Sequence, residues 1–312
     1  MSIIDQFNSK KMNQLFEMKE YFSFFKTLIL NKKFPKVLLI TGDKGFGKST
    51  LINHLMHFIF DSNNYDIHKN IFKQNTDFDI QYNQNIFQNI IYLPGSLFTN
   101  VKVENIRNLK SEILKKSMNN LKRFIILDDI EIFNNHSLNA LLKLIEEPNK
   151  NNHFILINNK SKPLKETIKS RCIEIKFILN KASREKIISL LIDYFNQSTI
   201  FDYNLISTSP GNFIKYNYVF EKNNLNLKDD FKINLNKLLI LYKKEKDIFF
   251  FDLILFYTDY YFQILKNKNI YNNSLLIENR SKIIKGLNDF ILFNLNQNTL
   301  LNYIKNKLAL YG

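Results

Sequence analysis

A glycine-rich loop is the part of the sequence whose residue types and spacing point most directly to chemistry. The segment from Gly42 to Ser49 matches the pattern GxxxxGK[ST] in full, and three of the seven glycines in the chain fall within it. Glycines permit positive φ angles, so that backbone N–H groups can curl around phosphates. We therefore predict an ATP-binding loop formed by Gly42, Asp43, Lys44, Gly45, Phe46, Gly47, Lys48, Ser49 and Thr50.

The residues around this loop favour the same interpretation. The apolar run Lys36–Thr41 is typical of a buried strand, and Ser49–Phe60 has the apolar period of a helix. In this context Lys48 is expected to reach the β- and γ-phosphates and the Ser49 hydroxyl to ligate Mg²⁺. The alternative is a glycine-rich turn between a strand and a helix, which the full motif in this context makes the weaker hypothesis.

Two carboxylates form the second candidate site. Asp128 and Asp129 follow the apolar run Phe124–Leu127, so they lie at the carboxyl end of a predicted strand, where open α/β sheets bind ligands. Asp128 is placed to hold Mg²⁺ through water, and Asp129 to polarise an attacking water. Alone, the pair would be interpreted as solvated aspartates in a turn. The P-loop upstream favours the catalytic interpretation.

Composition and charge set wider limits. The 312 residues carry a formal net charge of +15, but only five of the 44 basic residues are arginine, and Lys, Asn, Ile, Phe and Tyr are abundant. An AT-rich genome produces this composition whatever the function, so the charge alone does not establish nucleic-acid binding. The single cysteine, Cys172, excludes an internal disulfide framework. No signal peptide and no apolar run of about 18 residues is recognised, which predicts a cytoplasmic protein without a membrane segment.

The elements that position these residues alternate between strands and helices. Strands are predicted at Lys36–Thr41, Ile90–Leu93, Phe124–Leu127, Phe154–Ile157 and Ile173–Ile178, with helices at Met12–Leu30, Ser49–Phe60, Val103–Leu114 and Ser137–Glu146. This pattern predicts an α/β domain with a parallel sheet between two layers of helices. Residues Asp61–Gln88 have no clear period and are interpreted as an irregular insertion.

Beyond Asn180 the sequence predicts helices only. Short helices are expected at Ala182–Asn196 and Pro210–Phe220, followed by helices from Asp229 to the end. The aromatic stripe Phe249–Tyr261 could stack nucleic-acid bases, but at helical spacing it is more often core or a subunit interface.

The stretch from Asp128 to Cys172 resembles a known family. Asn139–Pro148 (NALLKLIEEP), the strand Phe154–Ile157 and Thr167–Cys172 (TIKSRC) are similar to the bacterial clamp-loader AAA+ subunits, most closely to the delta-prime type of DNA polymerase III. The resemblance extends from about Val37 to Lys176. It implies an AAA+ domain at 1–178, a small helical lid at 179–224 and a helical oligomerisation collar at 225–312.

The resemblance also implies partners and further site residues. Family members form a five-subunit ring that places a sliding clamp on primed DNA, so motor and delta-type subunits, the clamp and primed DNA are the implied partners. In the Ser-Arg-Cys motif, Arg171 would act in trans on the ATP of a neighbouring motor subunit. Asn158 or Asn159 matches the position that orients the attacking water, and Asn158 is taken as the candidate.

Three departures from the family pattern bear on activity. Asp129 stands where the catalytic Glu is usual, Asn212 replaces the arginine of a Ser-Pro-Gly-Arg element, and the zinc-binding cysteines of many relatives are missing before Val103. The first two favour ATP binding with slow or no hydrolysis. The rival hypotheses are a gamma-type motor ATPase of the same machine, and a P-loop regulatory module unrelated to replication.

Overall fold

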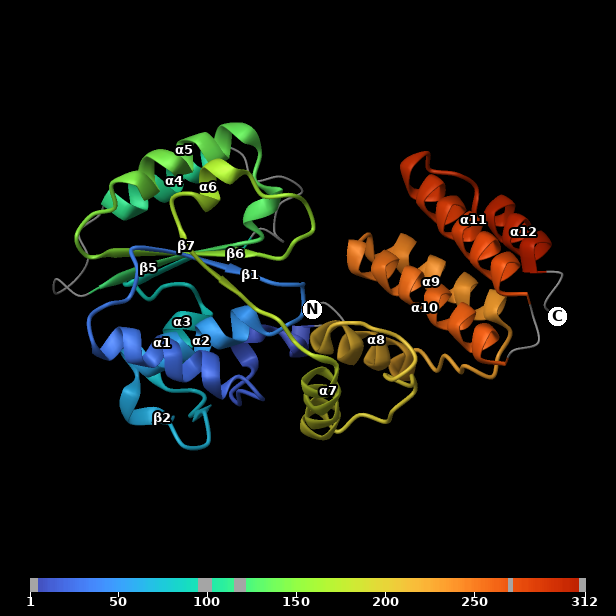
Figure 1. Ribbon diagram of the computed structural model, residues 1–312, viewed down its shortest axis with the longest axis horizontal. Coiled ribbons are helices and arrows are strands. Elements are labelled where there is room, and N and C mark those ends of the chain that lie inside the picture. The colour runs from blue at the N-terminus through green and yellow to red at the C-terminus, as the bar shows by residue number, and fades with distance from the viewer. Residues whose placement is uncertain (1–4, 95–102, 115–121, 269–271, 309–312) are drawn as a thin grey trace. The chain divides into compact units, whose positions relative to one another are not determined.

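The computed structural model describes residues 5–94, 103–114, 122–268 and 272–308, which form two compact units (Figure 1). The first unit contains Met1–Leu190 and the short segment Ser209–Asn212. The second contains Leu191–Thr208 and Phe213–Gly312. The segment Ser209–Asn212 thus belongs to the first unit although it follows part of the second in sequence. The division into nucleotide-binding domain, lid and collar remains a prediction.

A five-stranded parallel sheet forms the centre of the first unit. Its strand order is β4-β5-β6-β1-β7, with the strands at Ile90–Pro94, Arg123–Asp128, Asn152–Asn158, Val37–Thr41 and Ile173–Lys176. All five predicted strands are confirmed. Thr41 lies opposite Asn158, and Leu127 lies opposite Leu156, so β1, β5 and β6 end at the same edge of the sheet.

Helices cover both faces of this sheet, as the sequence predicted. In β1, Leu38 and Ile40 pack against one face and Val37 and Leu39 against the other, and all four are buried. Strands buried on both sides are apolar throughout, because neither face meets water. Figure 1 shows the two helical layers. One consists of α1 (Lys19–Leu30), α2 (Lys48–Phe60) and α3 (Asp77–Asn83), and the other of α4 (Val103–Leu114), α5 (Asn135–Glu146) and α6 (Glu166–Lys169).

The first predicted helix is shorter than expected. Helix α1 begins at Lys19, not at Met12, and the preceding residues form the 3-10 turns Asp5–Phe7 and Ser9–Lys11 and an extended segment. In that segment Leu15 donates its backbone N–H to the Asn70 carbonyl at 3.0 Å, and the Asn13 carbonyl accepts from Phe72 at 3.0 Å. The backbone here is therefore paired with a distant segment, and that pairing is incompatible with a helix.

The interpretation of Asp61–Gln88 as irregular is wrong. The segment forms a 3-10 turn (Ser62–Asn64), an antiparallel pair of strands, β2 (Tyr65–Asp66) and β3 (Ile71–Phe72), and helix α3. Its many polar residues conceal this order because several of them cap or pair within the fold. The Thr76 side chain caps α3 by accepting from the Asp79 N–H at 3.1 Å, and the Asp79 carboxylate accepts from Asn75 and Asn83.

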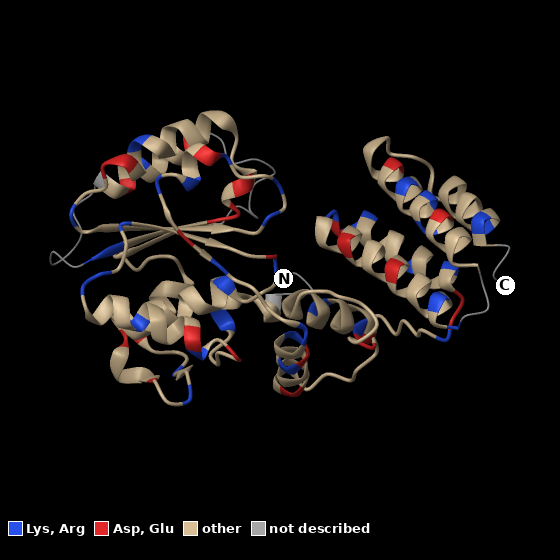
Figure 2. Cartoon of the chain, in the orientation of Figure 1, with Lys and Arg blue, Asp and Glu red and all other residues tan. Residues whose placement is uncertain are grey.

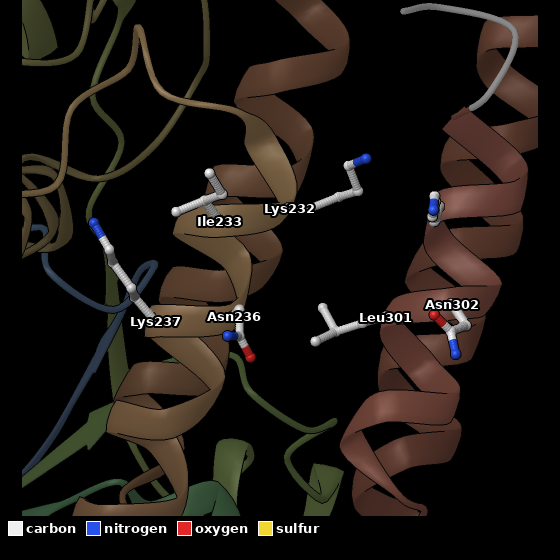
Figure 3. Close-up of a pocket in the computed structure, with 7 residues that line it drawn as sticks. Lys232, Ile233, Asn236, Lys237, Leu301 and Asn302 are labelled. Carbon is white, nitrogen blue, oxygen red and sulfur yellow. The ribbon is translucent and has the colours of Figure 1, made fainter.

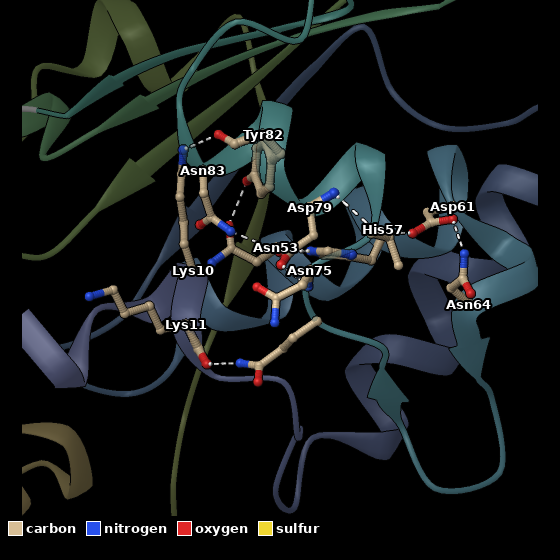
Figure 4. A network of polar contacts seen from close by, with 12 residues as sticks. Lys10, Lys11, Asn53, His57, Asp61, Asn64, Asn75, Asp79, Tyr82 and Asn83 are labelled. Atoms are coloured by element: carbon tan, nitrogen blue, oxygen red, sulfur yellow. Dashed lines mark hydrogen bonds and ion pairs between the residues drawn. The ribbon is translucent and has the colours of Figure 1, made fainter.

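Figure 4 shows that these polar residues form a network with α2 and the N-terminal segment. The Tyr82 hydroxyl donates to Asn53 Oδ1 at 2.5 Å, and Lys10 Nζ donates to the Tyr82 carbonyl at 3.1 Å. His57 is fully buried, stacks on Phe72 at 3.6 Å between ring centroids, and burial lowers its pKa to about 4. The network is an internal part of the first unit.

The second unit is helical. Its helices are α9 (Phe231–Glu245), α10 (Ile248–Asn267), α11 (Asn273–Leu292) and α12 (Gln297–Leu308), while α7 (Lys181–Phe195) and α8 (Pro210–Lys222) each cross from one unit to the other. The aromatic stripe of α10 is largely core. Phe256, Tyr257 and Tyr260 are buried, and Phe201 packs edge-on against Tyr260 at 4.9 Å between ring centroids.

Helix α10 is longer and more apolar than the sequence analysis expected of any segment. It is long and apolar enough to cross a membrane by those two criteria, whereas no such run was recognised in the sequence. More than half of its most apolar window, 56%, is buried inside the protein. A core helix of this bundle meets the same criteria, so we interpret α10 as core.

Charged residues are interspersed over both units. Figure 2 shows Asp and Glu among the Lys and Arg on the helices of both units. The exposed pair Lys282–Glu278 and the half-buried pair Arg280–Asp259 contribute to this mixture. The net charge of the chain therefore does not by itself identify a nucleic-acid surface.

The Tyr82–Asn53 hydrogen bond gives a stability prediction for the α2–α3 layer. We expect Tyr82→Phe to lower the free energy of unfolding of the first unit by about 1–3 kcal/mol, because the buried Asn53 Oδ1 then lacks its donor. Urea denaturation followed by circular dichroism measures this change. Tyr21→Phe is the control, since the Tyr21 hydroxyl makes only long, exposed contacts at 3.4 Å, and a loss equal to that of Tyr82→Phe would contradict the prediction.

Candidate functional site

The predicted phosphate loop connects β1 to α2, as its motif requires. Gly42 continues directly from Thr41, and its N–H donates to the Asn158 carbonyl at 3.1 Å. Gly45 and Gly47 have φ angles of 87° and 85°, in the left-handed region that favours glycine. Helix α2 begins at Lys48 directly after Gly47, so its first N–H groups and the positive end of its dipole face the loop.

Lys48 turns back into its own loop. Its Nζ donates to the carbonyls of Gly42 at 2.6 Å and Asp43 at 2.8 Å, and the side chain is 2% exposed. Burial lowers the pKa of Lys48 to about 8, although the nearby carboxylates, first Asp128 and then Glu131, act in the opposite direction. A buried ammonium held only by neutral carbonyls retains strong affinity for an anion. The cradle is therefore chemically suited to phosphate.

The segment Ser209–Asn212 packs directly on this loop. Gly211 donates its N–H to the Gly45 carbonyl at 3.0 Å, and a Cβ on Gly45 would lie 2.4 Å from the Ser209 hydroxyl. This is the Ser-Pro-Gly-Asn element, and the Asn212 Oδ1 would lie 3.2 Å from the same Cβ. The element thus contacts the loop, with a neutral side chain in place of an arginine.

Asp128 accepts hydrogen bonds from several directions. Its Oδ2 accepts from the Ser49 hydroxyl at 3.0 Å and from the Tyr92 hydroxyl at 3.0 Å, while its Oδ1 accepts from the Asp129 N–H at 2.9 Å. Burial raises the pKa of Asp128, with a further contribution from Asp129. The structure thus brings together Ser49 and Asp128, the two residues that the sequence assigned to Mg²⁺.

Tyr92 is a site residue that the sequence analysis missed. It lies on β4, opposite Ile126 of β5, and so reaches the carboxylate at the end of the adjacent strand. The available signal was a hydroxyl-bearing residue inside the apolar run Ile90–Leu93. That signal points to the site only when the strand order, with β4 beside β5, is known.

Asn159, rather than Asn158, contacts the acidic pair. Its Nδ2 donates to Asp128 Oδ1 at 3.1 Å and to Asp129 Oδ1 at 2.7 Å. Asn158 is the buried last residue of β6, and its Oδ1 accepts from the Lys160 N–H at 3.0 Å. Of the two asparagines, Asn159 is therefore the one beside the acidic pair, and its role in orienting water stays a prediction. Both residues follow the same apolar strand, so the sequence left their orientation open.

Asp129 is held by the protein itself. It has a φ of 54°, in the left-handed region, and one of its carboxylate oxygens accepts from Asn159. An aspartate is one methylene shorter than the usual glutamate. The short side chain and the Asn159 hydrogen bond together hold this carboxylate within the acidic cluster.

The residues present fit a magnesium-bound nucleotide. Ser49 Oγ and Asp128 Oδ2 lie 3.0 Å apart and would offer two hard oxygen ligands, and Lys48 lies at the start of α2. Mg²⁺ typically takes one or two protein ligands and completes its shell with phosphate and water. In the described residues no group of three or more His, Cys, Asp or Glu side chains could hold a metal. When bound, Mg²⁺ would neutralise charge on the phosphates.

Arg171 lies outside this cluster. Its side chain is 37% exposed, its Nε and Nη2 each lie 2.7 Å from Glu146 Oε1, and its Nη1 donates to the Thr167 carbonyl at 2.9 Å. The neighbouring Cys172 is half-buried, and burial raises the pKa of its thiol to about 12. The motif therefore presents an exposed guanidinium beside an unreactive thiol.

A hollow of about 350 Å³ lies between α9 and α12 in the second unit (Figure 3). Lysines line it, but Lys232 lies 3.7 Å from Asp230, and Lys237 lies 3.9 Å from Asp229. These carboxylates offset the positive charge. The hollow carries no group that indicates chemistry.

Comparison with known proteins identifies the family to which this chain belongs. Residues 17–180 match the family described as "DNA polymerase III, delta subunit", which is more than half of the chain. The chain belongs to this family of clamp-loader AAA+ proteins. The matched segment contains the P-loop, the acidic pair, Asn159 and Arg171.

Several curated relatives of this clamp-loader protein are DNA polymerase III subunits. The gamma subunit of Buchnera aphidicola subsp. Schizaphis graminum is 32% identical over 139 residues, covering 41% of this chain and 38% of that protein. The delta' subunit of Pseudomonas aeruginosa is 31% identical over 74 residues, covering 24% and 23%. The chain thus matches well under two thirds of the length of these relatives.

Solved structures show a weaker likeness. A DNA polymerase III gamma subunit-related protein from Thermotoga maritima has a TM-score of 0.47 and 16% identity, covering 92% of this chain and 97% of that one. The fold of this clamp-loader protein therefore rests on its own strand order and loop geometry.

The pKa of Lys48 gives a pH prediction. In the nucleotide-free chain Lys48 loses its proton near pH 8, whereas a bound triphosphate favours the charged form and raises this pKa. Below pH 8, where Lys48 is already charged, ATP affinity should therefore not change with pH through this residue. Above pH 8 it should fall by up to about tenfold per pH unit. Calorimetry at pH 9 in two buffers should show uptake of up to one proton. A constant affinity between pH 7.5 and 9.5 would contradict the assignment.

Proposed function

We propose that this chain is a delta-prime-like clamp-loader subunit of the DNA polymerase III holoenzyme. It binds ATP and Mg²⁺ at the Gly42–Thr50 loop, hydrolyses ATP slowly or not at all, and supplies Arg171 to the nucleotide site of a neighbouring motor subunit. Its partners are motor and delta-type subunits, and through them the sliding clamp and primed DNA. It acts in the cytoplasm, where bacterial replication proteins work.

The contrast between the P-loop and the acidic pair supports nucleotide binding without fast turnover. Lys48 lies at the start of α2 and the Ser49 hydroxyl contacts Asp128, and both positions support binding of phosphate and Mg²⁺. Asp129, the candidate base, is short and accepts a 2.7 Å hydrogen bond from Asn159. A general base must reach the water that it activates, and Asp129 is directed into its own cluster instead. This contrast is the observation that carries the proposal.

The environment of Arg171 supports action in trans. Its hydrogen bonds run to Glu146, Thr167 and Ser170, and none of them runs to the P-loop or the acidic pair. Exposed ion pairs such as Arg171–Glu146 contribute only about 0–1 kcal/mol. Exchanging Glu146 for a partner's phosphate therefore costs little, and a guanidinium forms strong bidentate bonds with phosphate oxygens.

Arg171→Ala tests the trans role. We expect the variant to keep the ATP affinity of the isolated chain, because Arg171 does not contact the P-loop. In the reconstituted assembly it should lower the DNA- and clamp-stimulated ATPase by about 10³-fold or more, the usual effect of losing an arginine finger. Arg107→Ala, which removes another exposed arginine of the first unit, is the matched control. An unchanged rate of the assembly would refute the trans role.

The isolated chain distinguishes the rival functions. A gamma-type motor ATPase predicts ATP turnover by the purified chain at motor-like rates and loss of that turnover in Lys48→Ala. The delta-prime-like role predicts ATP binding, abolished by the same substitution, with little turnover before or after it. An unrelated P-loop module predicts no co-elution with a clamp-loader motor subunit in size-exclusion chromatography, where our proposal requires it.

A further inference from the structure

Glu131 is a buried carboxylate that the proposed function leaves unused. It lies three residues after Asp128, in the 3-10 turn Ile130–Ile132, and is 6% exposed. Among the described residues no Lys, Arg or His lies within ion-pair distance of it. A buried anion needs other compensation.

That compensation comes from the segment that follows β6. The Asn159 N–H donates to both carboxylate oxygens of Glu131 at 3.1 Å, and the N–H and hydroxyl of Ser161 donate at 3.2 and 2.8 Å. Lys160 between them has a φ of 58°, which turns the backbone so that both amides face the same carboxylate. Glu131 therefore fixes the backbone of a three-residue turn.

The same turn carries the amide that joins the acidic pair. The Asn159 side chain donates to Asp128 and Asp129, while its backbone N–H donates to Glu131. Asn159 thus connects the buried Glu131 carboxylate, through its backbone, to the carboxylates beside Ser49, through its side chain. The bonds to Glu131 fix the backbone of Asn159, and this fixed backbone positions the side chain that bridges Asp128 and Asp129.

We propose that Glu131 is a positioning residue that acts through Asn159. It keeps the Asn159 amide across Asp128 and Asp129, and this bridge holds the Asp128 carboxylate toward Ser49, ready for Mg²⁺. The inference rests on the proposed binding of Mg·ATP. It concerns chiefly the metal-dependent part of nucleotide affinity. Neither Glu131 nor Asn159 forms a hydrogen bond with the P-loop, and the turn meets the loop through the exposed Lys160–Asp43 pair at 3.2 Å.

A double-mutant cycle tests this role. Dissociation constants for ATP are measured with Mg²⁺ and with EDTA for the wild-type chain, Glu131→Gln, Asn159→Ala and the double variant. Each single substitution should weaken Mg·ATP binding by about tenfold, as loss of an outer partner of a metal ligand does. ATP binding in EDTA should weaken by a clearly smaller factor, because Glu131 also favours the charged form of Lys48. The double variant should be no weaker than Asn159→Ala, because both substitutions break the same path.

Additive losses in the cycle, or equal losses with and without Mg²⁺, would overturn the positioning role. Ser161→Ala is a milder variant should Glu131→Gln fold poorly, since it removes only the 2.8 Å hydroxyl bond and should weaken Mg·ATP binding by a smaller factor. Glu166→Gln is the matched control because its side chain is 84% exposed and pairs with Lys169. A wild-type chain that fails to bind Mg·ATP would instead refute the proposed function, which separates the two failures.

Discussion

The hydrogen bond between the Ser49 hydroxyl and the Asp128 carboxylate joins two segments that are 79 positions apart in the chain. It exists because β1 and β5 flank β6 and all three strands end at the same edge of a parallel sheet. The apolar cores on both faces of the sheet fix these strands in register. Every other contact of the site, from Lys48 on one side to Asn159 on the other, depends on that shared edge.

Most of the charge at this edge is held by hydrogen bonds, and Lys160 and Asp43 form an exposed ion pair at 3.2 Å. Lys48 is bonded to carbonyls of its own loop, while Asp128, Asp129 and Glu131 favour its charged form from nearby. The carboxylates are in turn held by hydroxyl, amide and backbone donors. Lys48 and these three carboxylates are thus bonded to neutral groups and not to one another. This arrangement leaves their charges available to a charged ligand.

The sequence was sufficient for the parts of the fold that depend on local patterns. Five apolar runs predicted five strands, and a complete motif between a strand and a helix predicted the phosphate loop. It was insufficient where distant residues decide the outcome. Asn13 and Leu15 pair with the segment around Asn70, so α1 starts later than its periodicity suggests.

The same limit applies within the site. The choice between Asn158 and Asn159 depends on which side chain faces the acidic pair after the strand ends. Tyr92 required knowledge of strand order, and Glu131 became interpretable only when the turn after β6 was seen to donate to it. The motif residues of the loop needed no such information, since their spacing alone brings them together.

The contact between Gly45 and Ser209 has a consequence for how this sequence can change. The chain has only seven glycines among its 312 residues, and its composition is biased toward Lys, Asn and Ile. At Gly45 any side chain would meet two obstacles, a left-handed backbone and the Ser209 hydroxyl. Replacement of Gly45 therefore meets both barriers at once, and it would require a compensating change more than 160 residues away in the chain.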